Sequence, residues 1–185
     1  AGRVNRLAQP PFVETAKWYM YFVLPPGRVA AFGDGNAGSP PDSTYFAPLA
    51  AANRNIVLQW FYLNYPPRGQ LRSLPWMLLW FDSTVEPTSP EGKMPHGRAY
   101  RAHGAAISSR TDWNPRSTAC AVYGKAGVEH YHEHHDAGQV CIDGYGERLI
   151  VDTGTGPYNH PQHGPWDIGS AGHNTMLIDG QGQKP

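Results

Sequence analysis

The chain has 185 residues, 40% of them hydrophobic and 12% aromatic, which is enough to bury one large core or two small ones. Fifteen lysines and arginines balance fifteen aspartates and glutamates, so there is no basic excess to favour nucleic acid or an anionic membrane surface. No run of about eighteen apolar residues occurs, which excludes a membrane-spanning helix by the length argument.

The first part of the chain predicts helices separated by loops. Residues 12–24 are rich in aromatic side chains and fit a helix or a strand. The glycines and prolines of residues 31–43 predict a loop. Residues 46–65 place apolar side chains three to four positions apart, which favours one amphipathic helix. Residues 73–82 predict a further short helix.

The sequence changes character at residues 85–97, a proline-rich stretch that predicts a linker between two domains. Beyond it, short segments rich in β-forming residues alternate with turn signals, the pattern of an antiparallel sandwich or barrel. These segments are AAISSRTDW, TACAVYG, QVCID, ERLIVD and NTMLID. Cys120 and Cys141 lie in two neighbouring segments and are interpreted as ordinary buried thiols.

Four histidines, a glutamate and an aspartate lie within residues 130–136. Histidine titrates near neutral pH and is the commonest metal ligand, so the cluster indicates a metal site, an acid/base site or both. In an extended chain His132, His134 and Asp136 would project to one face. His130 to His134 also spell the inverted zinc-protease motif, but that motif needs a helix, and strand-like flanks leave little room for one.

Two more polar residues adjoin strand-like segments. Asp152 ends the apolar run 149–151, where a carboxylate is costly unless it is paired or bound to a cation. His173 opens the segment at residues 174–179 in the same way. Together with a histidine of the cluster they would make a reasonable zinc set, with the fourth position left to water or another group. The alternative is that Asp152 caps the following turn and that His173 hydrogen-bonds to the backbone.

These motifs, in this order, resemble the heparinase II/III-like polysaccharide lyases. The family's H-x-H-x-D-x-G corresponds to residues 132–138, its D-x-G-x-x-x-Y to residues 152–158, and its H-N-T to residues 173–175. The upstream segment with Arg110 and Trp113 matches the family's approach to the first motif. The resemblance covers roughly residues 100–183.

The resemblance implies a mixed, multidomain α and β fold that is a fragment of a longer chain. Residues 1–84 would be the last helices of an (α/α) toroid, residues 85–97 the linker, and residues 98–185 the N-terminal portion of an antiparallel β-sandwich. The rest of the toroid, with the family's principal catalytic residues, would lie upstream. This chain would therefore supply only one side of the active site.

The resemblance also implies roles for single residues. Zn²⁺ would be mostly structural, and its ligands would be His134, Asp152 and His173. His132 would face the substrate as a catalytic residue, with Tyr158 as the second catalytic candidate. Arg110 and Trp166 are expected to bind substrate.

The function implied is β-elimination on a uronic-acid-containing polysaccharide or oligosaccharide, of the alginate or glycosaminoglycan type. Polymeric uronates are too large to enter a cell intact, so we expect a bacterial protein that is periplasmic or secreted. The expected partners are the acidic polysaccharide and the missing toroid, with no nucleic acid or membrane and with a homo-oligomer left open.

Two other functions stay open on the sequence. A cupin-like metal-dependent oxygenase or isomerase also places H-x-H on a strand, but Gln139 and Val140 stand where its glutamate is expected. A noncatalytic carbohydrate-binding sandwich with a structural metal is the other alternative.

Overall fold

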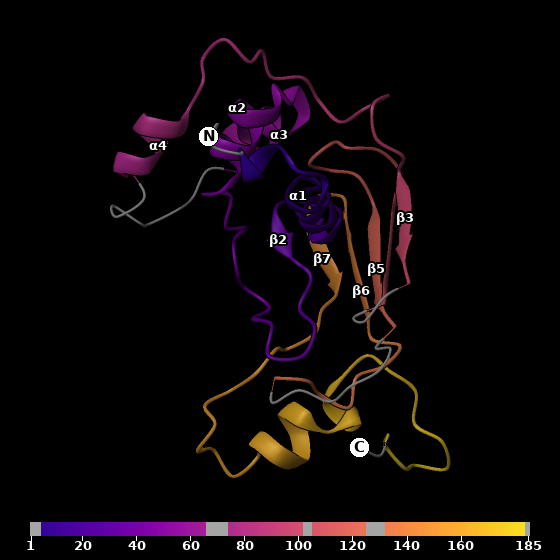
Figure 1. Cartoon of the computed structure of the whole chain (residues 1–185). Coiled ribbons are helices and arrows are strands. Elements are labelled where there is room, and N and C mark those ends of the chain that lie inside the picture. Colours follow the sequence, from indigo (N-terminus) through magenta and orange to yellow (C-terminus); the bar gives the residue numbers. More distant parts are fainter. Residues whose placement is uncertain (1–4, 66–73, 102–104, 125–131, 184–185) are drawn as a thin grey trace. The chain divides into compact units, whose positions relative to one another are not determined.

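The computed structural model describes residues 5–65, 74–101, 105–124 and 132–183 (Figure 1). Contacts divide the chain into two compact units. The first consists of Ala1–Tyr21 and Pro40–Pro95, and the second of Phe22–Ser39 and His96–Pro185. The division changes unit between Pro95 and His96, and it also assigns residues 22–39, from the helical part of the sequence, to the unit that contains the sheet.

The first unit is helical. Among its described residues, a short 3-10 helix is followed by four α-helices; the helices are η1 (Arg6–Ala8), α1 (Pro10–Phe22), α2 (Phe46–Asn53), α3 (Ile56–Asn64) and α4 (Leu74–Trp80). Phe46 of α2 stacks on Phe61 of α3 with ring centroids 4.6 Å apart, and both side chains are buried. Residues 12–24 are thus mostly helix, and the short helix predicted at residues 73–82 is confirmed.

The prediction of one continuous helix over residues 46–65 is wrong, because the chain breaks into α2 and α3. Arg54 ends α2 in the left-handed conformation, with φ 48° and ψ 41°. Asn55 then caps α3, and its side-chain oxygen accepts hydrogen bonds of 3.1 Å from the N–H groups of Val57 and Leu58. The apolar spacing continues across the break, so periodicity alone does not locate it.

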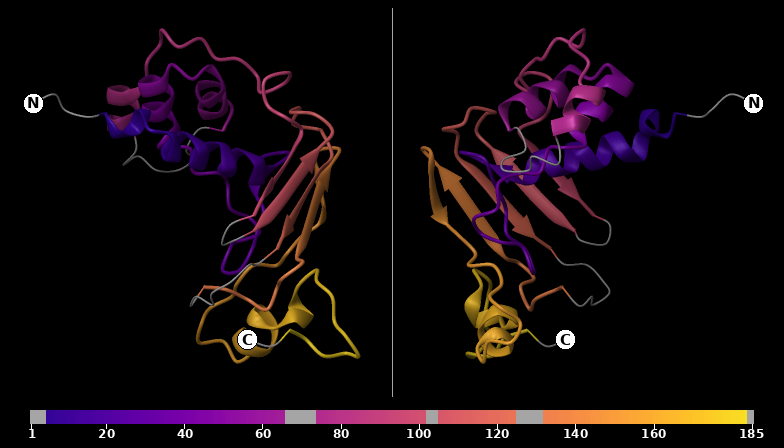
Figure 2. Two further views of the ribbon diagram at one scale, coloured as in Figure 1. Left: turned by 45° about the vertical axis from the view of Figure 1, so that its right-hand side comes forward. Right: turned by 90° about the vertical axis from the view of Figure 1, so that its left-hand side faces the viewer.

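The second unit is built on a five-stranded antiparallel sheet in which each strand pairs with the next along the chain (Figure 2). The strands are β3 (Gly97–Tyr100), β4 (Ala106–Arg110), β5 (Ala119–Tyr123), β6 (Val140–Gly144) and β7 (Glu147–Ile150). Tyr145 and Gly146 join β6 to β7 with φ values of 59° and 88°. Positive φ at both central residues is the geometry of a tight hairpin turn, so the turn predicted at this place is confirmed.

Residues 22–39 cover one face of this sheet. They begin with a small hairpin of β1 (Val23–Leu24) and β2 (Arg28–Val29). Phe32 stacks on Tyr123 of β5 at 5.0 Å, and the Cys141 thiol of β6 lies 3.7 Å from the Ala31 carbonyl oxygen. The covered face is lined mainly by small buried side chains, which let the backbone of the segment approach closely. These are Ala106, Ser108, Ala119, Ala121 and Cys141.

The two cysteines do not pair, and the sheet register explains why. Cys120 lies opposite Ile142 and Cys141 lies opposite Ala121. Successive residues of a strand point to opposite faces, so the two thiols lie on different sides of the sheet. Both are free.

The strand predicted at residues 174–179 does not form. The chain here follows a π-helix, η3 (His163–Ile168), and a 3-10 helix, η4 (Ser170–Gly172). Its only ladder contact in the described part of the chain is an isolated bridge between Ile178 and Gln181. The sequence shows a strand's composition at this place, but a strand also needs a partner along its length.

The fold is therefore mixed α and β with an antiparallel sheet, as predicted, and the described residues form two sheets, the five-stranded one and the two-stranded sheet of β1 and β2. None of the helices in those residues is long and apolar enough to cross a membrane.

Replacement of Asn55 by Ala removes the cap of α3 and should lower the free energy of unfolding by about 1 kcal/mol. Asn55→Ser retains a capping oxygen, so its free energy of unfolding should stay close to that of the parent protein. Chemical denaturation of the three proteins makes the comparison. Equal stability of Asn55→Ala and the parent would show that the cap contributes nothing.

Candidate functional site

A carboxylate from the loop after β2 lies at the centre of the candidate site. Asp34 Oδ2 contacts His132 Nδ1 and accepts a hydrogen bond from the hydroxyl of Tyr158. Asp34 Oδ1 lies 2.9 Å from Nε2 of His134. The His132 Nδ1 and Tyr158 hydroxyl oxygen are themselves 3.2 Å apart. One carboxylate thus joins three side chains that come from two later parts of the second unit.

The two histidines of this cluster differ in exposure. The side chain of His132 is 74% exposed, whereas that of His134 is 1% exposed. His132 can therefore meet a ligand from solvent, and His134 cannot. That the two residues have different tasks stays a prediction.

The loop that carries Asp34 is fixed to residues 132–136 by its backbone. The Asp34 N–H donates to the His132 carbonyl oxygen at 3.1 Å, and the Gly33 N–H donates to Asp136 Oδ2 at 2.9 Å. Gly33 has φ 53°, and a Cβ atom there would lie 2.5 Å from the His132 carbonyl oxygen. A glycine is therefore required for this close approach.

The hydrogen bonds set the charge of Asp34. Burial opposes its ionisation, but hydrogen bonds from Tyr158, His132 and His134 outweigh this effect and lower the pKa of Asp34 to about 2. The same bond to Asp34 raises the pKa of Tyr158, because a phenolate beside the carboxylate would lose the bond. At neutral pH the carboxylate is ionised and the phenol keeps its proton.

A second, buried pair lies next to His134. His173 Nδ1 is 2.6 Å from Asp152 Oδ2, and the rings of His134 and His173 have centroids 5.1 Å apart. Asp152 also accepts a bond of 2.6 Å from Gln139 Nε2 and one of 2.7 Å from the N–H of Gly154. Burial opposes protonation of His173, but the bond to Asp152 outweighs it and raises the pKa of His173. The turn cap considered for Asp152 is thus present, and His173 bonds to a carboxylate.

The three predicted zinc ligands, His134, Asp152 and His173, lie close together, but their side chains are not arranged as the ligands of one metal ion. Two imidazoles and a carboxylate suit zinc chemically, and His173 Nε2 is buried without a hydrogen-bond partner in the described part of the chain. Both oxygens of Asp152, however, are already held by hydrogen bonds. Among the described residues no group of three or more His, Cys, Asp or Glu side chains is arranged to hold a metal ion. Zinc at this place therefore stays a prediction.

The ring of Tyr158 packs against a polar residue of η3. Its ring meets His163 edge to face, with centroids 4.8 Å apart and an interplanar angle of 78°. His163 Nδ1 lies 3.2 Å from Asp167 Oδ2, which also accepts a 2.9 Å bond from Gly156 N–H. Trp166 lies on the same helix and is half exposed, as a residue that stacks on a sugar would be.

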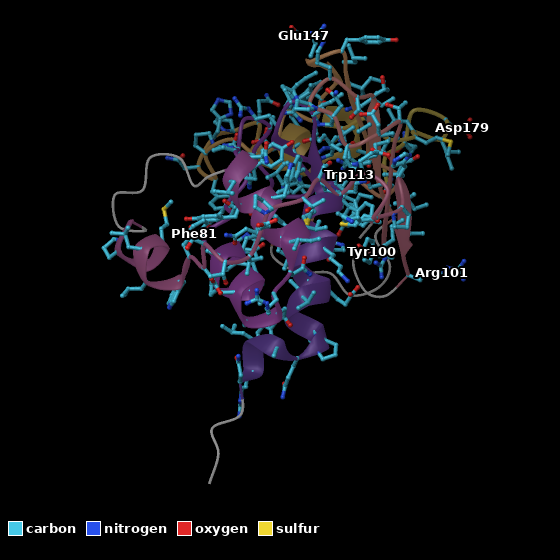
Figure 3. All side chains as sticks on the ribbon, turned by 90° about the horizontal axis from the view of Figure 1, so that it is seen from above. Phe81, Tyr100, Arg101, Trp113, Glu147 and Asp179 are labelled. Carbon is cyan, nitrogen blue, oxygen red and sulfur yellow. The ribbon has the colours of Figure 1, made fainter. Side chains whose placement is uncertain are left out.

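Arg110 lies in a different environment from the one expected of a substrate-binding residue. It is buried, its Nη2 donates to the Val23 carbonyl oxygen at 3.2 Å, and its guanidinium lies 4.0 Å from the ring centroid of Trp113. Trp113 is itself buried and lies among the packed side chains (Figure 3). These contacts favour a structural role for Arg110, in tying the covering segment to β4.

Asp34 is the residue of this site that the sequence patterns do not single out. The glycines and prolines of residues 31–43 predict only a loop, although a carboxylate between two glycines, Gly-Asp-Gly, is a signal of close backbone approach. His130 lies outside the described residues. Residues 132–138 form turns and bends rather than a helix or strand, which suits neither the zinc-protease motif nor a cupin strand.

Comparison with known proteins bears on this site directly. Residues 102–184 match the family model described as Heparinase II/III-like, C-terminal. This segment, which covers less than half of the chain, is similar to the heparinase II/III-like C-terminal family. The resemblance seen in the sequence is confirmed, and the heparinase II/III-like segment contains His132, His134, Asp152, Tyr158 and His173. Asp34 lies outside it.

Solved structures show the same fold. A heparan sulfate lyase from Pedobacter heparinus is similar with TM-score 0.64 and 16% identity, over 92% of this chain and 25% of that chain. A heparinase III is similar with TM-score 0.63 and 16% identity, over 94% of this chain and 25% of that one. At this identity the likeness concerns the fold alone, and the chain spans about a quarter of the length of these structures. None of the curated proteins matches the chain significantly.

Replacement of Gly33 by Ala should break the docking of the Asp34 loop, because a Cβ atom at this φ is strained and meets the His132 carbonyl. We expect a loss of about 1–3 kcal/mol in the free energy of unfolding. Gly38→Ala is the matched control, since its Cβ would meet only Asn36 Oδ1, at 3.9 Å. Denaturant unfolding compares the two variants, and similar stabilities would contradict the proposed docking.

Proposed function

We propose that this chain is part of a polysaccharide lyase that cleaves a uronic-acid-containing polysaccharide by β-elimination, and that it contributes His132 and Tyr158 to the active site. The observation that supports the proposal most is the pairing of these two proton-transfer groups, 3.2 Å apart, within the heparinase II/III-like segment. Both side chains are exposed to solvent, so a polymer can reach them.

The chemistry of β-elimination requires what these groups supply. A base removes the proton α to the uronate carboxylate, and the electrons of that C–H bond form a double bond to the neighbouring carbon. The bond from that carbon to the glycosidic oxygen breaks, and an acid gives the leaving oxygen a proton. An imidazole and a phenol side by side can carry out both transfers, each worth about 10²–10⁴ in rate when positioned.

The remaining parts of the proposal concern substrate and place. Similar solved structures include a heparan sulfate lyase, so a glycosaminoglycan is the first polymer to test and alginate the second. We propose that a toroid elsewhere in a longer chain neutralises the uronate carboxylate and completes the cleft. Because such polymers do not enter cells intact, export to the periplasm or the medium belongs to the same proposal.

The full-length protein should release unsaturated uronate product from at least one such polymer, measured by its ultraviolet absorbance. His132→Ala and Tyr158→Phe should each lower kcat by about 10²-fold or more, the scale of a positioned acid or base. His160→Ala, at an exposed histidine of the same region, should be unaffected. If no polymer yields product, the lyase proposal fails and a carbohydrate-binding sandwich becomes the better interpretation.

Zinc makes a separate prediction, supported by the donor set and by the unpartnered Nε2 of His173. Metal analysis should find one zinc ion for each chain, and His134→Ala, Asp152→Ala and His173→Ala should lose it. His132→Ala and His160→Ala should retain it. Loss of zinc should also lower stability, because a metal that binds only the folded state adds its binding free energy to folding. Absence of zinc in the parent protein, or equal content in all variants, would exclude the site.

A further inference from the structure

We propose that Asp34 is a positioning residue of this active site, which holds Nδ1 of His132 and the hydroxyl of Tyr158 on one carboxylate oxygen and so presents Nε2 of His132 to the substrate. The catalytic role of Asp34 rests on the proposed function. The contacts of Asp34 with His132 and Tyr158 do not depend on it. The inference assigns a task to a residue outside the family-matched segment.

The first support is the shared acceptor. His132 and Tyr158 come from different loops, and both reach Asp34 Oδ2. Their side chains are largely exposed, so little packing restricts their rotation. A group that must be in place for proton transfer gains from a fixed partner, because side-chain freedom is then lost before the substrate binds. The common oxygen brings the two groups within 3.2 Å of each other.

The second support is that Asp34 is better anchored than the groups it holds. Its N–H is bonded to the His132 carbonyl oxygen, and its other carboxylate oxygen lies 2.9 Å from the buried His134. Gly33, the preceding residue, is bonded to the buried carboxylate of Asp136. The exposed pair therefore takes its position from Asp34, and Asp34 takes its position from the interior of the unit.

The contact also determines which nitrogen of His132 is available. A carboxylate accepts hydrogen bonds and does not donate them, so the Nδ1 of His132 that faces it must carry a proton. A neutral imidazole protonated at Nδ1 has its lone pair on Nε2. Asp34 thus makes Nε2 the atom that accepts a proton from the substrate. By the same reasoning, the Tyr158 hydroxyl is the donor in its bond to Asp34.

The test uses the full-length protein with histidine labelled in the ring, because ring signals distinguish the two tautomers by NMR. The His132 signal is identified by its absence in His132→Ala. We expect the Nδ1–H tautomer in the parent protein and, in Asp34→Ala, a shift toward the tautomer mixture of a free imidazole. Asp179→Asn is the matched control, since this exposed turn residue at φ 50° lies at the margin (Figure 3). It should leave the signal unchanged.

Steady-state kinetics give a second test of the role of Asp34. Asp34→Ala and Asp34→Asn should lower kcat by about 10²-fold while KM changes by less than about threefold, because positioning acts on the chemical step. In a background that carries both His132→Ala and Tyr158→Phe, the same substitutions should lower kcat by less than about threefold, since a residue that acts through two others is not additive with their loss. Full additivity in this cycle would overturn the proposal.

The two proposals fail in different ways. A parent protein without lyase activity on any polymer removes the proposed function, and the histidine signal still decides the role of Asp34. If Asp34→Ala does not fold, as judged by circular dichroism, the tautomer of His132 in the parent and in Asp34→Leu decides, because a Leu side chain is of similar size and accepts no hydrogen bond. An Nε2–H tautomer of His132 in the parent, or an unchanged His132 signal in folded Asp34→Ala or Asp34→Leu, would overturn the assignment.

Discussion

The candidate site depends on the docking of one short loop, residues 33–35, onto the turn at residues 132–136. Two backbone N–H groups of this loop donate to the turn, one to a carbonyl oxygen and one to the carboxylate of Asp136. Glycine at position 33 makes the approach possible, because any side chain there would meet the His132 carbonyl. The docked loop then places a carboxylate where two exposed groups and one buried histidine can all reach it.

This arrangement joins an interior of buried polar groups to a solvent-exposed pair. Asp136, Asp152, His134 and His173 are all buried, and each makes at least one hydrogen bond that offsets part of its lost hydration. Together they form a buried polar cluster. His132 and Tyr158 project from its edge, and they remain accessible to a substrate while their positions are restricted. Accessible groups held in restricted positions are what the proposed acid–base chemistry would need.

The sheet contributes to the site through its covered face. Small side chains on β4, β5 and β6 allow residues 22–39 to lie close to the strands, and this segment ends a few residues after Asp34. The Arg110–Trp113 contact and the bond from Arg110 to the Val23 carbonyl help to hold the segment there. Arg110, which the sequence suggests as a ligand for an acidic sugar, is buried here and hydrogen-bonded to the segment that carries Asp34.

The sequence by itself determined the local features. The turn between β6 and β7, the alternating strands, the helix at α4 and the order of the H-x-H, Asp and His motifs all follow from neighbours in the chain, and the family resemblance followed from that order. Only the tertiary structure decided the rest. The break at Arg54, the missing strand at residues 174–179 and the burial of Arg110 depend on partners distant in sequence. Asp34 is the clearest case, because its partners lie 98 to 124 positions further along the chain, where no local pattern can indicate them.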